Sequence, residues 1–135
     1  MQITFGNAGT DGAGFKGWFM GDLNRWAPEN DGTAFGLRQS SIIEMKWGVH
    51  RAGETRPEWA PCSNNSTLSL LVRGKFLARF RKPNNPDAVI EQRLVREGDY
   101  AVWGTDLEHT WVVEEDSVIF TVRWLASTTT IQKPW

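Results

Sequence analysis

The sequence has little of several residue types, and each shortage excludes a class of protein. Its 135 residues include one cysteine, Cys62, so no disulfide can form within the chain. No apolar run is long enough to span a bilayer, and the opening MQITFGNAGTDGAG lacks the charged start and apolar centre of a secretion signal. These absences predict a soluble, cytoplasmic protein with no membrane partner.

Charge of one sign is also missing. Lysine and arginine number 15 against 16 aspartates and glutamates, and the two signs are interspersed along the chain. Because such a chain sets up no broad positive field, nucleic acid is not expected as a partner. The sequence also shows no Ser-His-Asp order, phosphate-binding loop or paired-carboxylate motif.

What the sequence does contain is apolar residues at period two, in short blocks separated by Gly, Pro and Asn clusters. No apolar stripe of period 3.6 runs far enough for a helix longer than about three turns. We therefore predict one all-β domain over 1–135, a sandwich or barrel of about eight strands with loose ends at about 1–14 and 126–135.

The candidate strands follow from the same pattern. Residues 66–80 are expected to be a hairpin that bends near Arg73 and Gly74, and 82–87 a turn. The other expected strands are 16–24, 40–50, 88–95, 96–103, 109–115 and 117–125.

The segment GDYAVWGTDLEHTW, residues 98–111, resembles the second motif of the cupin superfamily. In that motif a Gly opens a turn and a metal-binding His follows eleven residues later, as Gly98 and His109 do here. The motif's Pro and inner Gly are replaced by Gly104 and Asp106, and its later Asn by Val113. The resemblance implies a double-stranded β-helix, or jelly-roll barrel, in which this corner brings His109 to the barrel mouth.

The first cupin motif, which has two histidines, a glutamate and a closing glycine, is degenerate here. With Gly74 as the closing glycine, Thr67 takes the glutamate position and Cys62 and Ala60 take the histidine positions. A spacing one residue shorter places Pro61 and Ser63 there instead. The resemblance is strongest over 40–125 and suggests a small single-domain, RmlC-like cupin.

A ligand site is expected in the barrel. If His109 faces the cavity, strand alternation points Trp111 to the same side. By the same argument Thr67, Ser69 and Leu71 line the opposite wall. Such walls suit a small organic ligand with apolar and polar faces, such as a sugar or a carboxylate. The alternatives are that His109 only satisfies a turn carbonyl and that Trp111 fills the barrel.

His50 has two interpretations. In SSIIEMKWGVH it shares a face with Glu44 and Lys46, opposite the apolar residues, and a polar face often meets solvent. In a ligand-binding barrel with a polar interior, the same face points inward. The sequence leaves both open.

No cofactor is certain. A zinc, iron, manganese or nickel ion needs three or more N, O or S donors. The candidate metal ligands are His109, His50, Cys62, Glu44 and Glu58.

Two functions are consistent with these residues. The first is a stand-alone cupin that binds a small metabolite without transforming it. The second is a cupin enzyme of the isomerase, epimerase or metal-dependent dioxygenase kind, using His109 with His50. The resemblance to cupins, which pair their edge strands across a two-fold axis, implies a homodimer, with the strand around Trp18 to Leu23 as the expected contact. Most of the eight tryptophans are expected in the core or in this interface.

Overall fold

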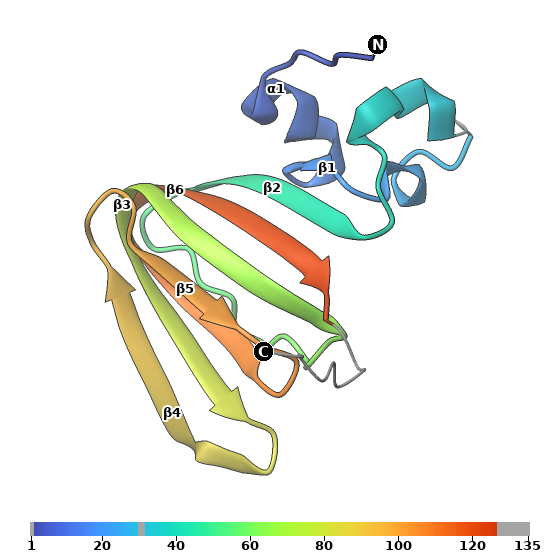
Figure 1. Ribbon diagram of the computed structural model, residues 1–135. Coiled ribbons are helices and arrows are strands. Elements are labelled where there is room, and N and C mark those ends of the chain that lie inside the picture. Colours follow the sequence, from blue (N-terminus) through green and yellow to red (C-terminus); the bar gives the residue numbers. More distant parts are fainter. Residues whose placement is uncertain (1, 30–31, 127–135) are drawn as a thin grey trace, which may run out of the picture.

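The alternating blocks of the sequence form antiparallel strands that wrap into a barrel (Figure 1). The computed structural model describes residues 2–29 and 32–126. The strand order is β1-β2-β6-β3-β4, and β5 pairs with β3. The strands are β1 (Trp18–Met20), β2 (Ile43–His50), β3 (Asn65–Lys82), β4 (Asn85–Leu94), β5 (Tyr100–Trp103) and β6 (Glu108–Leu125). The all-β prediction is confirmed.

Strands β3 and β6 are each continuous over 18 residues, and they pair with each other along nearly their whole length. The expected hairpin at Arg73 and Gly74 is therefore wrong. The register between the two strands shifts between Leu71 and Phe76, and Gly74 has a φ of 108°. These features form a bulge that bends both strands without reversing them. The expected strands 109–115 and 117–125 are likewise two halves of one strand, so the described residues form six strands rather than about eight.

The bend of the two strands is fixed by one hydroxyl. Ser117 Oγ accepts a hydrogen bond from the Lys75 backbone N–H at 3.0 Å and lies 2.7 Å from the Glu115 carbonyl, to which it donates. A Cβ on Gly74 would overlap Ser117 and the Asp116 carbonyl. The chain therefore needs a glycine at this point both for its φ and for its space.

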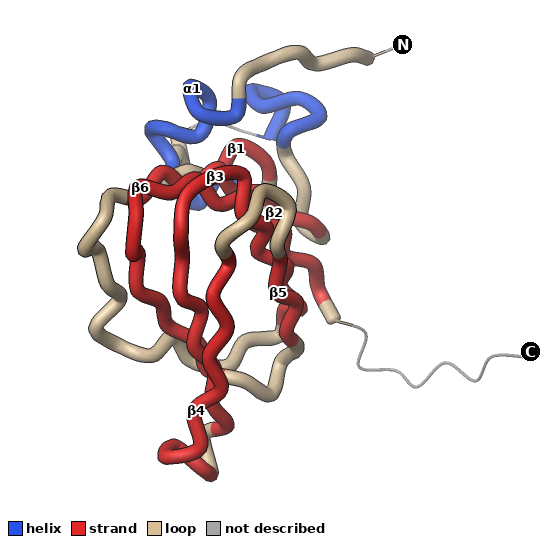
Figure 2. Tube along the Cα trace, turned by 90° about the vertical axis from the view of Figure 1, so that its left-hand side faces the viewer, coloured by secondary structure: helices blue, strands red, loops and turns tan. Residues whose placement is uncertain are grey.

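The turns predicted around the remaining strands are present. The turn expected over 82–87 is shorter, at residues 83–84, so β4 begins at Asn85, three residues before the expected strand 88–95. Strand β5 ends at Trp103, before the break at Gly104 and Asp106. Figure 2 shows the β3–β4 hairpin extending beyond the body of the barrel.

The N-terminal segment packs on one side of the barrel and has more regular structure than expected. Within the segment expected to be loose, Ala8–Gly12 form the helix α1, whose first turn is capped by the Asn7 side chain through the Thr10 N–H at 3.0 Å. The strand expected over 16–24 shortens to β1, because residues from Leu23 turn into a 3-10 helix. The 3-10 helices are η1 (Ala13–Phe15), η2 (Leu23–Arg25) and η3 (Gly32–Arg38).

The α-helix described has five residues, and Gly32–Arg38 is divided by a kink at Gly36, where φ is 55°, so helices stay short, as expected for a chain without a helical apolar stripe. Within 2–29 and 32–126, no helix has the length and apolarity of a membrane span. The expected loose C-terminal end, with Trp135, lies outside the described residues except for residue 126.

The apolar core lies at the bent end of the barrel. It consists of buried side chains from both halves of β3 and β6 and from the end of β4, and Trp111 packs against it. Its members are Leu71, Phe76, Leu94, Val113 and Ile119. This core closes one end of the barrel, and the space above it is the candidate site.

Candidate functional site

The barrel encloses a cavity of about 370 Å³. Its walls come from inward-facing residues of all six strands and from the loop that carries Ala60 to Ser63. The polar and charged side chains of the wall are Lys46, His50, Arg56, Cys62, Ser63, Thr67, Ser69, His109, Thr110, Thr121 and Arg123. The aromatic and aliphatic ones include Trp18, Phe76, Phe80, Leu94, Trp103, Trp111 and Ile119.

The strand register arranges one wall in three tiers. Thr67 pairs with Arg123 at the end remote from the bulge, which we call the outer tier. Ser69 pairs with Thr121, which also pairs with Lys46 of β2, in the middle tier. Leu71 pairs with Ile119 beside the core, and we call this end the closed end.

His109 lies in the second wall, where β6 begins. It pairs with Phe80 of β3, and its backbone exchanges hydrogen bonds with Ala60. Its ring centroid is 4.9 Å from that of Trp103 and 6.4 Å from that of Trp111. The break at Gly104 and Asp106 thus turns the chain from β5 into β6 and places His109 on the cavity wall, as the cupin resemblance implied.

The imidazole of His109 is held in its neutral form. Burial, and then the positive charges of Arg56 and Arg123, lower the pKa of His109 from 6.5 to about 4. Near neutral pH the ring can therefore accept or donate a hydrogen bond without carrying charge.

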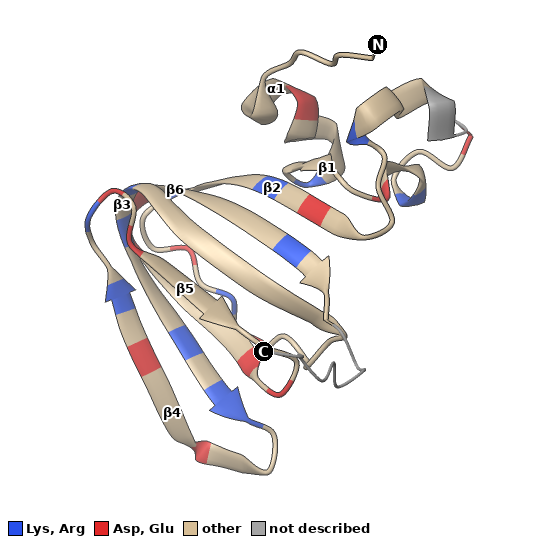
Figure 3. Cartoon of the chain, viewed as in Figure 1, with Lys and Arg blue, Asp and Glu red and all other residues tan. Residues whose placement is uncertain are grey.

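Three cationic side chains line the same cavity, and sequence reasoning missed all of them as site residues. Lys46 and Arg123 come from neighbouring strands, and Arg56 comes from the loop that follows β2. Figure 3 shows the single basic segment of β6, near its arrowhead, beside the acidic and basic segments of β2. Burial, and then the charge of Arg123, lower the pKa of Lys46. The cations therefore destabilise one another in the absence of an anion.

Arg123 is the cation with the most unusual environment. Its Nη2 lies 3.5 Å from Glu44 Oε1, but its buried Nε has no hydrogen-bond partner among the described residues. Its guanidinium carbon lies 4.2 Å from the centroid of the Trp18 ring. A buried donor without a partner in the chain is rare, and a water molecule or an acceptor on a ligand can satisfy it.

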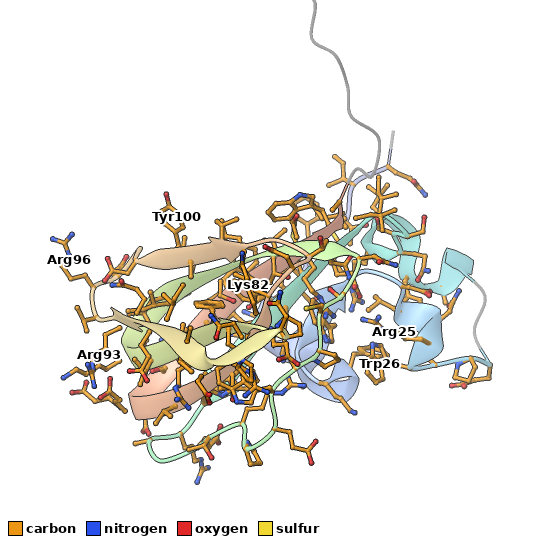
Figure 4. The ribbon with its side chains drawn as sticks, turned by 90° about the horizontal axis from the view of Figure 1, so that it is seen from below. Arg25, Trp26, Lys82, Arg93, Arg96 and Tyr100 are labelled. Carbon is orange, nitrogen blue, oxygen red and sulfur yellow. The ribbon has the colours of Figure 1, made fainter. Side chains whose placement is uncertain are left out.

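The N-terminal segment completes this end of the site. Trp18 is only 7% exposed, lines the cavity, and also lies 5.6 Å from Lys46 Nζ. Arg25 pairs with Glu44, and its guanidinium carbon lies 5.0 Å from the centroid of the Trp26 ring. Figure 4 shows Arg25 beside Trp26. Trp18 is therefore part of the cavity wall, and the dimer contact expected around Trp18 to Leu23 stays a prediction.

His50 points inward, so the polar face of β2 is an interior face. Its ring lies 5.8 Å from both the Phe76 and the Trp111 rings. Its Nδ1 is 3.3 Å from Glu54 Oε2, and burial lowers its pKa despite that carboxylate. Of the two interpretations of this strand, the polar-interior one is correct.

The candidate ligand residues are mostly brought together. Thr67, Ser69, His109 and Trp111 all line the cavity, and Trp111 does not fill it. Leu71 does not line it, because it is fully buried in the core. The bulge after Leu71 turns the strand there, and the wall continues with Phe76 instead.

The candidate metal ligands do not form a metal site. His50, His109 and Cys62 line the cavity, but Glu44 is bound by Arg25 and Arg123, and Glu58 is exposed. Among the described residues, no three His, Cys, Asp or Glu side chains are close enough together to hold an ion. The other charged side chains of the wall are Lys46, Arg56 and Arg123, which are cations and cannot serve as metal ligands. The residues therefore do not fit the metal that the cupin resemblance implies.

Comparisons with known proteins rest on structure alone. No protein-family model matches the chain, and no curated protein matches it in sequence. The chain is similar to the capsular polysaccharide assembling protein CapF from Staphylococcus aureus, with a TM-score of 0.49 and 19% identity. The match extends over 68% of this chain and 25% of that one. It thus spans about a quarter of that protein.

Two solved structures are similar over more of their length. KdgF from Halomonas sp. matches with a TM-score of 0.54 at 15% identity, over 67% of this chain and 77% of that one. BH2720 from Bacillus halodurans matches with a TM-score of 0.54 at 6% identity, over 67% and 69% of the two chains. At these identities the likeness concerns the fold. With the bent strands, the corner at Gly98 to His109 and the barrel cavity, it shows that the chain has the cupin jelly-roll fold.

Proposed function

We propose that the protein binds a small organic anion in its barrel, in the cytoplasm. The observation that carries this proposal is the charge of the wall: Lys46, Arg56 and Arg123 line the cavity, and no Asp or Glu among the described residues does. Lys46 is half-buried without an ion-pair partner among the described residues, and burying a charge without a counter-charge is costly, so an anion in the cavity would stabilise this wall. A guanidinium binds a carboxylate or phosphate through directed hydrogen bonds.

Size limits the anion. A cavity of about 370 Å³ is at the lower end of the range for small-molecule sites, which extends from roughly 300 to 1,000 Å³. A monomeric metabolite fits this volume, and an oligomer does not. The neutral His109 and the indoles of Trp103 and Trp111 supply the remaining contacts.

The test is binding of a panel of small carboxylates, namely pyruvate, benzoate, glucuronate and cyclohexanecarboxylate, followed by tryptophan fluorescence. At least one is expected to bind, and Arg123→Gln is expected to weaken it about tenfold or more. Arg79→Gln is the matched control, because Arg79 pairs with Glu91 away from the cavity. Equal affinity in wild type and Arg123→Gln contradicts the proposal.

If Arg123→Gln fails to fold, Lys46→Met gives the second measurement. Lys46 has no ion-pair partner among the described residues and its pKa is lowered by burial, so its removal is not expected to destabilise the fold. The same loss of carboxylate affinity is expected.

A second candidate is proton transfer of the isomerase or epimerase kind, favoured by the pair His50 and Glu54. A carboxylate on Nδ1 orients an imidazole and leaves Nε2 for acid-base work. The test is incorporation of deuterium from D₂O into a carbon-bound position of a bound carboxylate, read by NMR. Exchange lost in His50→Gln supports catalysis, and binding without exchange supports a binding protein. A dioxygenase reaction is not proposed, since the donor set does not fit a metal.

We also propose a homodimer that uses the outer face of the barrel. The side chains there are apolar and several are exposed, among them Tyr100 at 62% and Val102 at 51%. Figure 4 shows Tyr100 pointing away from the barrel. In the same face Leu68 pairs with Val102 and Val122, so the surface here is uncharged and can face the same surface of a second copy across a two-fold axis without charge repulsion.

A further inference from the structure

We infer that the ligand is an anion with an apolar body, seated with its charged group at the outer and middle tiers and its carbon skeleton against the closed end. This inference rests on the proposed function and names the class of anion. It separates hydrocarbon carboxylates from polyhydroxylated sugar acids of the same size and charge.

The closed end offers an apolar surface. Phe76, Leu94 and Ile119 line the cavity there, and all three also belong to the buried core. Trp111 packs against the same cluster, and Ala78, which pairs with Trp111 across the strands, presents only a methyl group. Carbon atoms placed there gain contacts and lose water, whereas hydroxyl groups placed there lose their hydrogen bonds.

The hydroxyl groups of the wall are mostly engaged with the protein itself. Ser69 Oγ and Thr121 Oγ1 lie 3.0 Å apart and bond to each other. The Thr110 hydroxyl donates to the Arg56 carbonyl. At the closed end the nearest polar ring is His50, and Glu54 holds its Nδ1, so at most its Nε2 is free for a ligand. A sugar ring at the closed end would therefore find few partners there for its hydroxyl groups.

Two of the three cations sit at the opposite end, whereas Arg56 lies over Trp111 on the second wall, with 5.3 Å between its guanidinium carbon and the ring centroid. Arg123, with its unpartnered Nε, is in the outer tier beside Thr67, and Lys46 is in the middle tier. The tiers thus run from cationic to apolar toward the core. A ligand that matches this gradient has one anionic group at one end of a compact hydrocarbon body.

The test compares three probes with six-membered rings. Cyclohexanecarboxylate has the charge and an apolar body, glucuronate has the charge and hydroxyls, and cyclohexanecarboxamide has the apolar body without the charge. We expect cyclohexanecarboxylate to bind at least tenfold more tightly than either of the others, measured by calorimetry on the full chain, because one unpaired hydroxyl or one lost charge contact costs roughly that factor.

The outcomes separate the inference from the proposed function. Glucuronate binding as tightly as cyclohexanecarboxylate, or neither carboxylate binding, overturns the inference about the body. The carboxamide binding as tightly as the carboxylate overturns the proposed anion site. These two results do not depend on each other.

A variant of the wall tests the location of the body. Ala78→Ser adds one hydroxyl to the wall and is small enough to be accommodated, and it is expected to weaken cyclohexanecarboxylate about threefold to tenfold while leaving glucuronate unchanged or tighter. Val102→Thr, on the outer face, is the matched control and is expected to change neither. If the ratio of the affinities for cyclohexanecarboxylate and glucuronate is the same in Ala78→Ser as in wild type, the hydrocarbon part of the ligand does not lie at Ala78, and the inference is overturned.

Discussion

Glu44 Oε1 lies 3.5 Å from Nη2 of Arg123, but Glu44 does not line the cavity. Arg123 therefore has a counter-charge on one side and an unpartnered Nε on the other. The strand register places the two residues directly opposite each other on β2 and β6. The protein's own carboxylate and an incoming anion thus compete for one guanidinium.

Removal of this counter-charge should strengthen anion binding. Glu44→Gln leaves Arg123 less neutralised, and a half-buried charge pair of this kind contributes about 1 kcal/mol, so the affinity for cyclohexanecarboxylate should rise about fivefold. Calorimetry measures the change. Glu91→Gln, which removes the partner of Arg79, should have no effect. Weaker binding in Glu44→Gln would mean that Glu44 serves to position Arg123.

The stability of the protein should fall on mild acidification because of His109. Its pKa is about 4 in the folded chain and 6.5 ordinarily, so between these values the unfolded chain binds more protons. The free energy of unfolding should therefore decrease as the pH falls from about 6.5 to 4, by on the order of 3 kcal/mol at most.

His109→Gln isolates this effect, since glutamine does not titrate. Urea denaturation gives the free energy of unfolding of each protein. The value for wild type minus the value for the variant should decrease as the pH falls across that window. Asp99, whose pKa is lowered from 3.8 by backbone hydrogen bonds, contributes stability that is lost only at lower pH. A parallel pH dependence in wild type and variant would show that the imidazole is not buried as a neutral ring.

His109→Ala should fold and should bind carboxylates less well. The ring contacts Trp103 at a tilt and stacks with Trp111 on the cavity wall, and its side chain has no ion-pair partner among the described residues. Thermal denaturation and fluorescence titration give the two readouts. A clear loss of stability with unchanged binding would make His109 a structural residue of the turn.

Two glycines with similar backbone angles should differ in their tolerance of a side chain. Gly74 and Gly98 have φ values of 108° and 93°, but only at Gly74 would a Cβ overlap neighbouring atoms. Gly98→Ala should cost about 1 kcal/mol from strain alone, and Gly74→Ala about 3 kcal/mol or more. Chemical denaturation measures both. Equal losses would mean that the bulge can relax.

The proposed dimer should separate when charge is placed on the outer face. Val102→Lys should give a monomer by light scattering with little change in melting temperature, because Val102 is exposed in the single chain. Ile90→Lys is the control, because Ile90 is exposed on β4, which pairs with the second half of β3, whereas β5 and Val102 pair with the first half. A wild-type monomer at micromolar concentration would contradict the proposal.

Much of the barrel could be predicted from local patterns. Alternation defined β2 within three residues at its start, and the spacing from Gly98 to His109 located the corner and its histidine. The pattern could not show that Gly74 bends a strand instead of reversing it, because a glycine with positive φ suits a hairpin and a bulge equally. That choice depends on pairing with β6, which is a long-range property.

The cations of the site illustrate the same limit. Arg123 follows His109 by an even number of residues and both face inward, but that argument requires a single strand from Glu108 to Leu125. If two strands meet near Asp116, as the sequence pattern predicts, the even spacing no longer places Arg123 on the same side as His109. The position of Trp18 in the site could not be predicted for another reason. Its place beside Arg123 depends on how the N-terminal segment packs against the barrel.

The continuity of β3 and β6 also decides how a ligand gets in. Each of these two strands contributes to both walls. The walls therefore cannot separate, because widening the barrel would break the hydrogen bonds between β3 and β6 along their length. Exchange with solvent must therefore occur through the short loops that line the cavity, at Pro61 to Ser63 and at Gly104. The rates of ligand entry and release are then properties of those loops, whereas the affinity is a property of the strands.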